Sequence, residues 1–163
     1  MDDWPTQSGT GVRFEWGPVG ADRLASEAAC LVVVDVLSFT TAVSVACGKG
    51  TRVLPFRWPE RPATAVEQAG IEKAAAAYAR QSGARLAVHR ADVTPATPWS
   101  LSPAHLRQAP FVARLVLPSP NGAAICAAAP RDVRLVAACL RNVTAVGGWL
   151  TAHGYGTPDH PVA

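Results

Sequence analysis

The residues of this chain with the clearest chemical potential occur at three places where a short apolar run gives way to polar residues. They are Asp35, Thr40 and Thr41 at the first place, Ser119, Asn121 and Gly122 at the second, and Arg141 and Asn142 at the third. Each place is predicted to be a turn between a strand and a helix. Because the first N–H groups of a helix lack partners within the helix and carry partial positive charge, such turns attract anions. The three turns therefore predict a site for a small anionic metabolite.

Asp35 is the strongest single candidate, because it interrupts the Val- and Leu-rich run Leu31–Val36 just before a turn. A buried carboxylate without a partner is costly, so Asp35 should hold a metal, a basic side chain or helix N–H groups. A Mg²⁺ ligand is one interpretation. The alternative is a structural aspartate that caps the following turn.

The second and third turns also allow two interpretations. Ser119 and Asn121 offer a hydroxyl and an amide, and Gly122 permits close approach of the backbone to a ligand. The alternative is an ordinary turn with a helix cap. Arg141 could neutralise an anion or face the solvent, and Asn142 could begin the last helix.

The elements that position these turns alternate along the chain. Apolar runs predict strands at 31–36, 51–56, 85–88, 115–117 and 133–138, with a short edge strand at 12–16. Helical spacing predicts helices at 21–29, 40–47, 63–81, 104–108 and 142–153. This alternation favours an α/β fold with three layers, α/β/α, around a mostly parallel sheet. In one parallel sheet the three turns would open on the same carboxyl edge, where ligands usually bind.

A Pro-, Ser- and Thr-rich stretch at residues 89–112 interrupts the alternation. Long loops in small domains are usually functional or mobile. His89 and Arg90 directly follow a predicted strand, so both could line the site, although a lone histidine is more often structural. Trp58 and Trp99 lie in predicted loops, where they could cover a ligand or contact a subunit.

The composition indicates one soluble α/β domain over residues 1–163, with 49% hydrophobic and 17% charged residues. Arginine outnumbers lysine thirteen to two, but the basic residues are scattered and the net charge is only +3. Such scatter makes a nucleic-acid partner unexpected. The arginine excess is read either as codon bias or as a capacity for binding phosphate and carboxylate.

Compartment is indicated by the cysteines and by the lack of long apolar segments. The cysteines, at 30, 47, 126 and 139, each lie in an apolar run, and no pair has zinc-ligand spacing. This pattern predicts reduced core thiols in a cytoplasmic protein. The acidic start carries no apolar signal segment, and no run is long enough to span a membrane.

Three motifs, taken in order, resemble those of the 2-phosphosulfolactate phosphatase family, the ComB-like proteins. They are Val33-Val-Asp35-Val-Leu-x-x-Thr40-Thr41, Ser119-Pro-Asn121-Gly122 and Leu140-Arg-Asn142-x-x-Ala145-Val146. The resemblance extends from about residue 31 to residue 150. It implies a ComB-like fold and a Mg²⁺-dependent phosphatase acting on a small 2-phospho acid, as in coenzyme M synthesis in methanogens. The Ala and Arg bias indicates a diverged bacterial, actinobacterial branch whose substrate need not be the same.

Applied to this chain, the resemblance and the turn chemistry assign a role to each candidate. Asp35 would hold Mg²⁺. The catalytic set is Asp35, Asn121 and Arg141, and the substrate-binding set is Thr40, Thr41, Ser119, Gly122, Asn142 and Arg90. The metal would polarise the phosphoryl oxygens and orient an attacking water.

Three departures from the family pattern favour a different class of function. Ser38 stands where the family has Arg, and His89-Arg90 stands where it has Gly-Glu. The family also continues into a C-terminal segment with further acidic residues. The alternative is a diverged, non-catalytic protein of the same fold that binds a small anion or serves in assembly.

The strand pattern is interrupted at Val162-Ala163. An open strand edge at this point would invite pairing. We therefore expect a further C-terminal segment, or a neighbouring subunit of a homodimer, to fill that edge.

Overall fold

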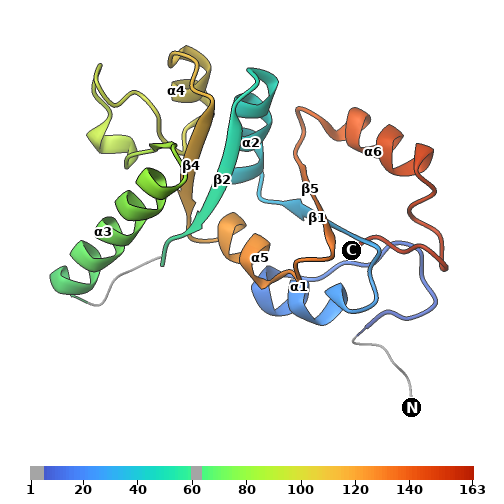
Figure 1. The fold of residues 1–163 in the computed structure, drawn as a ribbon. Helices are drawn as coiled ribbons and strands as arrows, with labels where there is room; N and C mark the ends of the chain where they lie inside the picture. Colours follow the sequence, from blue (N-terminus) through green and yellow to red (C-terminus); the bar gives the residue numbers. More distant parts are fainter. Residues whose placement is uncertain (1–5, 60–63) are drawn as a thin grey trace.

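The computed structural model describes residues 6–59 and 64–163, in which helices and parallel strands alternate as an α/β protein (Figure 1). In chain order the elements are α1 (Gly17–Ala25), β1 (Cys30–Val34), α2 (Phe39–Gly48), β2 (Arg52–Arg57), α3 (Ala65–Gln81), β3 (Arg85–Leu86), the 3-10 turn η1 (Arg90–Asp92), α4 (Pro103–Gln108), β4 (Arg114–Ser119), α5 (Gly122–Ala128), β5 (Arg134–Ala138) and α6 (Val143–Ala152). The alternation expected from the sequence is confirmed.

Two predictions near the N-terminus are wrong. The first helix begins at Gly17 instead of residue 21, because Pro18 suits the first turn of a helix. The edge strand predicted at 12–16 is reduced to one bridge, between Val12 and Val162. The Gln7 side chain explains this loss, since its amide takes up both the N–H and the C=O of Phe14.

The α3 helix shows how a local signal sets a helix start. The Thr64 hydroxyl accepts a hydrogen bond from the Glu67 N–H at 3.1 Å, which caps the helix just before Ala65. The start expected from the sequence, Ala63, lies outside the described residues.

The strands divide between two parallel sheets, where the sequence predicted a single one. One sheet pairs β1 with β5, and the other has the order β2-β4-β3. The C-terminal residues explain the division, because they occupy the edge of β1 that β5 leaves open. The Val32 N–H donates to the Ala163 C=O at 2.6 Å, and the Ala163 N–H donates to the Cys30 C=O at 3.0 Å. β1 therefore has β5 on one side and residues 161–163 on the other, and it pairs with neither β2 nor β4.

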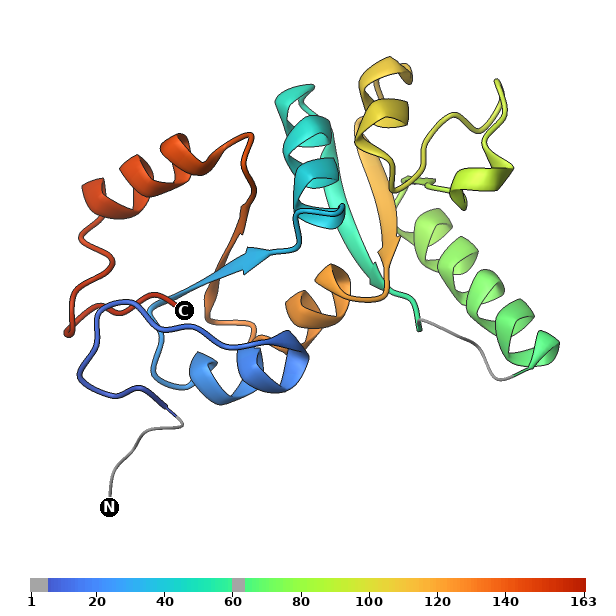
Figure 2. The same ribbon diagram turned by 180° about the vertical axis from the view of Figure 1, so that it is seen from behind.

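The helices α2 and α5 connect the two sheets. Each contacts elements of both sheets, and in opposite views they lie between the two groups of strands (Figures 1 and 2). The larger core forms around Phe39, Leu115 and Leu117, which are all buried. No helix in the described part of the chain is long and apolar enough to cross a membrane.

The four cysteines are free thiols, but they are not all in the core. Cys30 and Cys139 are buried, Cys126 is half-buried, and Cys47 is exposed, which corrects the prediction of four core thiols. Burial raises the pKa of the Cys30 and Cys126 thiols, so both stay protonated near neutral pH.

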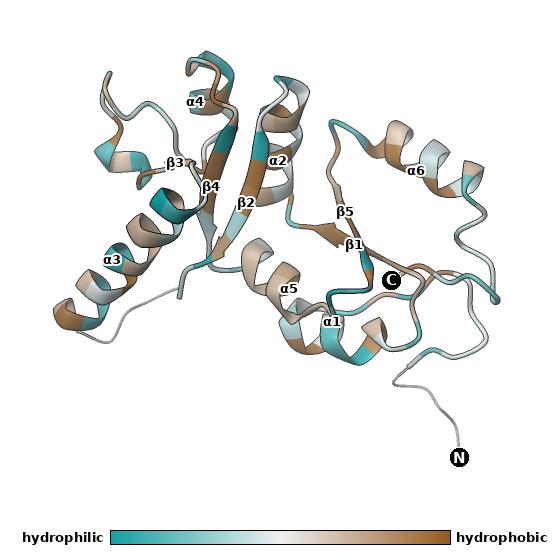
Figure 3. Cartoon of the chain, viewed as in Figure 1, coloured by the Kyte–Doolittle hydropathy of each residue, from teal (hydrophilic) through white to brown (hydrophobic). Residues whose placement is uncertain are grey.

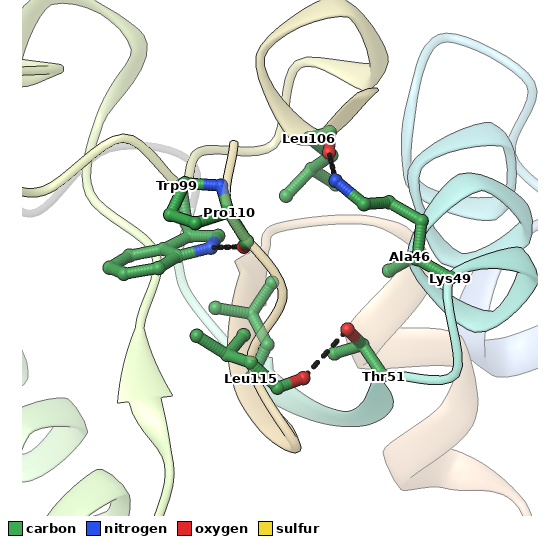
Figure 4. A pocket seen from close by; sticks show the side chains of 8 residues that line it. Ala46, Lys49, Thr51, Trp99, Leu106, Pro110 and Leu115 are labelled. Carbon is green, nitrogen blue, oxygen red and sulfur yellow. Dashed lines mark hydrogen bonds between the residues drawn. The ribbon is translucent and has the colours of Figure 1, made fainter. Parts of the chain in front are cut away.

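Lys49, which directly follows α2, binds the end of α4 (Figure 4). Its ammonium donates to the carbonyl oxygens of Leu106 at 3.1 Å, Arg107 at 3.3 Å and Ala109 at 2.5 Å. We expect Lys49→Met to lower the free energy of unfolding by about 2 kcal/mol, because three carbonyls lose a charged donor. Urea denaturation measures the change, with Lys73→Met on the exposed side of α3 as the control. Equal stabilities of the two variants would contradict this role.

Candidate functional site

The turn after β1 and the turn after β4 meet at a hydrogen bond between Asp35 and Gly122. The Gly122 N–H, at the first residue of α5, donates to Asp35 Oδ2 at 3.0 Å. Two of the three sequence-predicted turns are therefore adjacent, although β1 and β4 belong to different sheets. The N–H that the sequence assigned to phosphate donates to the half-buried Asp35 carboxylate instead.

Gly122 is required at this junction because Phe39 packs directly against it. A Cβ at position 122 would lie 2.1 Å from Phe39 Cδ1 and 2.4 Å from Phe39 Cγ, well inside contact distance. The sequence indicated that the backbone comes close to another group at Gly122, and that group is a side chain at the start of α2. Both residues are buried, so this contact fixes α5 against α2.

The two threonine hydroxyls at the start of α2 close the turn. Thr40 Oγ1 accepts the Asp35 N–H at 3.2 Å, and Thr41 Oγ1 donates to the Val36 C=O at 2.7 Å. The backbone N–H groups of Phe39 and Thr41 have no hydrogen-bond partner among residues 6–59 and 64–163. Phe39 and Thr40 are buried, Thr41 is half-buried, and the Thr41 hydroxyl donates its proton to the Val36 C=O, so the donor at this helix start that an anion could approach is the Thr41 N–H.

A cation reaches the same helix start from the loop at residues 89–112. Arg90 Nη2 donates to Ser38 Oγ, and Ser38 Oγ donates to the Leu101 C=O at 3.2 Å. The Arg90 guanidinium thus lies beside Ser38, the position at which the family that this chain resembles has an arginine. Sequence reasoning named Arg90 but could not pair it with Ser38, because 52 residues separate the two.

Two further residues named from the sequence accept hydrogen bonds from backbone N–H groups of the chain. The His89 Nδ1 accepts a hydrogen bond from the Ala91 N–H, which caps the η1 turn. Ser119 is buried, and its C=O accepts the Trp58 N–H at 3.2 Å. By contrast, Asn121 is exposed and makes no side-chain cap on α5. Of the second-turn candidates, Asn121 alone presents its side chain to solvent next to Gly122.

The third turn is closed by Asn142. Its Oδ1 accepts the Cys139 N–H at 2.8 Å, and its Nδ2 donates to the Ala137 C=O at 2.9 Å. Arg141 is exposed, and its Nη2 lies beside Gly48 at the C-terminal end of α2. That end is about 15 Å from the start of a ten-residue helix. The structure therefore does not bring Arg141 to Asp35.

Asp35 is the site residue whose chemistry suits a metal ion. In the described part of the chain, no three His, Cys, Asp or Glu side chains gather closely enough to hold a metal by themselves. The Asp35 Oδ2 atom accepts the Gly122 N–H, and no hydrogen bond to its Oδ1 occurs among the described residues. Mg²⁺ is commonly held by one or two carboxylates together with substrate phosphates. The donor set therefore fits a Mg²⁺ ion that arrives with a phosphorylated ligand.

Comparison with protein-family models, curated proteins and solved structures finds no match for this chain. The functional assignment therefore depends on the groups at the start of α2. Those groups are the Asp35 carboxylate, the Arg90 guanidinium and the Thr41 N–H, which has no partner among the described residues.

Proposed function

We propose that this protein is a Mg²⁺-dependent phosphatase that hydrolyses a small phosphorylated acid, on the three-layer plan of the 2-phosphosulfolactate phosphatase family. The observation that carries the proposal is that a carboxylate and a guanidinium bond to two adjacent turns. Asp35, at the end of β1, accepts the Gly122 N–H at the start of α5, and Arg90, in the loop after β3, donates to Ser38 just before α2. This combination offers a ligand for a cation and a partner for a phosphate in the same place.

Each group at the start of α2 has a distinct task in this proposal. The Thr41 N–H binds a phosphoryl oxygen, and the Arg90 guanidinium stabilises the charge on the phosphoryl group as water attacks. Asp35 holds Mg²⁺, which when bound supplies polarisation of the phosphoryl group. Asn121, which is exposed beside Gly122, would bind the acid group of the substrate through its amide.

A non-catalytic protein that binds a small anion is the second candidate. The observation in its favour is the absence, in the described residues, of any cluster of three potential metal ligands. In this case Asp35 acts mainly as the partner of the Gly122 N–H. The start of α2 and Arg90 would still bind phosphate.

A phosphate-release screen over short phospho-acids, with and without Mg²⁺, tests the two candidates. The phosphatase proposal requires release from at least one 2-phospho acid and loss of that release when Mg²⁺ is removed by a chelator. Calorimetric binding of inorganic phosphate is measured on the same sample. Binding without release would select the second candidate, and the absence of both would contradict the assignment of this site.

Arg90→Gln is expected to weaken the binding of inorganic phosphate by about 10- to 100-fold, because a hydrogen bond to a charged group is lost. Glutamine can still donate to Ser38, so thermal unfolding should change little. Titration calorimetry measures the affinity. Arg131→Gln, at an exposed turn between α5 and β5, is the control and should bind phosphate like the wild type. Equal affinities in the two variants would remove Arg90 from the site.

A further inference from the structure

Helix α6 carries apolar side chains that the described chain does not bury. None of its ten residues is buried, although Val, Ala, Trp and Leu make up most of them. An open groove of about 330 Å³ lies between α6 and β5, lined by Leu135, Val136, Asn142, Ala145, Val146 and Trp149. The hydrophobic colouring of β5 and of parts of α6 shows that both elements carry apolar residues (Figure 3). A helix at the surface of a globular protein normally packs its apolar side chains against the core.

The apolar surface continues from the groove onto the turn between β5 and α6. Leu140 is 82% exposed and Val143 is 58% exposed. We call the groove residues together with Leu140 and Val143 the β5–α6 face. Two further exposed residues, Val34 and Leu37, lie at the end of β1, where Val34 pairs in register with Ala138. A contiguous apolar surface of this kind marks an interaction site.

The total exposed area of the chain is larger than that of a typical folded monomer of its mass. The chain exposes 9808 Å². A folded monomer of 17.0 kDa exposes about 7,700 Å², so the excess is about 2,100 Å². An obligate dimer buries about 1,000–2,500 Å² on each subunit. Exposed apolar residues elsewhere, such as Phe14 and Trp16, contribute to this excess, but its size is compatible with the area that one subunit of a stable dimer buries.

We propose that the β5–α6 face is the interface between two copies of this chain, related by a two-fold axis. The residues that line its groove carry no charge, so two identical faces can meet without repulsion between like charges. An isologous contact of this kind uses the same surface on both subunits and needs no second complementary surface. Two cations lie beside the groove: Arg134, whose guanidinium lies over the Trp149 ring at 5.7 Å, and the exposed Arg141 between Leu140 and Asn142.

The contact is made by the helix and sheet faces, and not by pairing of strand edges. Backbone groups alternate sides along a strand. The Val32 N–H points to residues 161–163, so the backbone groups of the next residue, Val33, point to β5. Val33 pairs in register with Ala137, and in a parallel pair this register points the N–H and C=O of Ala137 away from β1. The Asn142 side chain bonds the Ala137 C=O and the Cys139 N–H on this outer edge. It therefore blocks edge-to-edge addition of a strand and leaves the side chains of the face as the contact.

Analytical ultracentrifugation of the protein over about 1–200 µM tests the proposal through mass action. The expected result is a dimer for the wild type and at least a tenfold higher dissociation constant for Leu140→Asp/Val143→Asp. Val66→Asp is the matched control. Val66 is 83% exposed in the first turn of α3, as Val143 is exposed in the first turn of α6, so aspartate suits both helix starts. Circular dichroism should show the same helix content in all three proteins.

Two outcomes would overturn the proposal. A wild-type monomer at every concentration would assign the face to a different polypeptide segment or partner. A dimer that persists unchanged in Leu140→Asp/Val143→Asp would place the interface elsewhere. The readout is mass and not catalysis, so the result does not depend on the proposed phosphatase function.

Discussion

Gly122→Ala is expected to lower the free energy of unfolding by about 3 kcal/mol, one of the largest effects of any single methyl group in this chain. The added Cβ would lie 2.1 Å from Phe39 Cδ1 and 2.7 Å from Phe39 Cβ. Neither atom is at the end of a flexible side chain, so α5 would have to move away from α2. That movement would also lengthen the hydrogen bond from the Gly122 N–H to Asp35. Denaturant titration followed by circular dichroism measures the change.

Two further variants test whether the loss of stability comes from the contact with Phe39 or from replacing any glycine with alanine. Gly148→Ala in α6 has open space around the new methyl group, and it should raise stability by up to about 1 kcal/mol. Phe39→Ala combined with Gly122→Ala should cost less than the sum of the two single changes, because removal of the ring leaves only the contact with the residue 39 Cβ at 2.7 Å. Additive costs would show that Phe39 does not limit position 122.

Asp35→Asn is expected to reduce Mg²⁺-dependent phosphate release by about a hundredfold or more while leaving the protein folded. The amide oxygen of asparagine can still accept the Gly122 N–H, so the junction between β1 and α5 is kept. The negative charge that would hold Mg²⁺ is lost. Release assays over a range of Mg²⁺ concentrations and thermal unfolding are measured on the same preparation.

Asp35→Ala separates the effect of losing the negative charge from the effect of losing the hydrogen-bond acceptor. It removes the acceptor of a buried N–H, so it should destabilise the protein by about 2 kcal/mol more than Asp35→Asn. Asp132→Asn, at an exposed turn, controls for the loss of one negative charge. If Asp35→Asn unfolds as readily as Asp35→Ala and keeps full phosphate release, the carboxylate is a structural cap alone.

Local sequence patterns were sufficient for most of the individual elements of this fold. The run Leu31–Val36 predicted β1, and the Ala-rich stretch ending at Gln81 predicted α3. Burial on both faces of a strand and burial along one side of a helix leave these periodic patterns in the chain itself. The same patterns could not predict the loss of the strand at 12–16. That loss depends on the Gln7 side chain, which replaces a strand partner at Phe14.

The sequence by itself determined that this is an α/β protein with parallel strands and that Asp35, Asn121 and Asn142 follow strands. Only the tertiary structure decided which of these residues meet. Asp35 and Gly122 are 87 residues apart, and Arg90 and Ser38 are 52 apart. Periodicity reports whether a residue faces the core, but it does not report which distant residue it contacts there. Strand pairing and side-chain packing make that choice, and here they divide the strands into two sheets while still bringing the first two turns together.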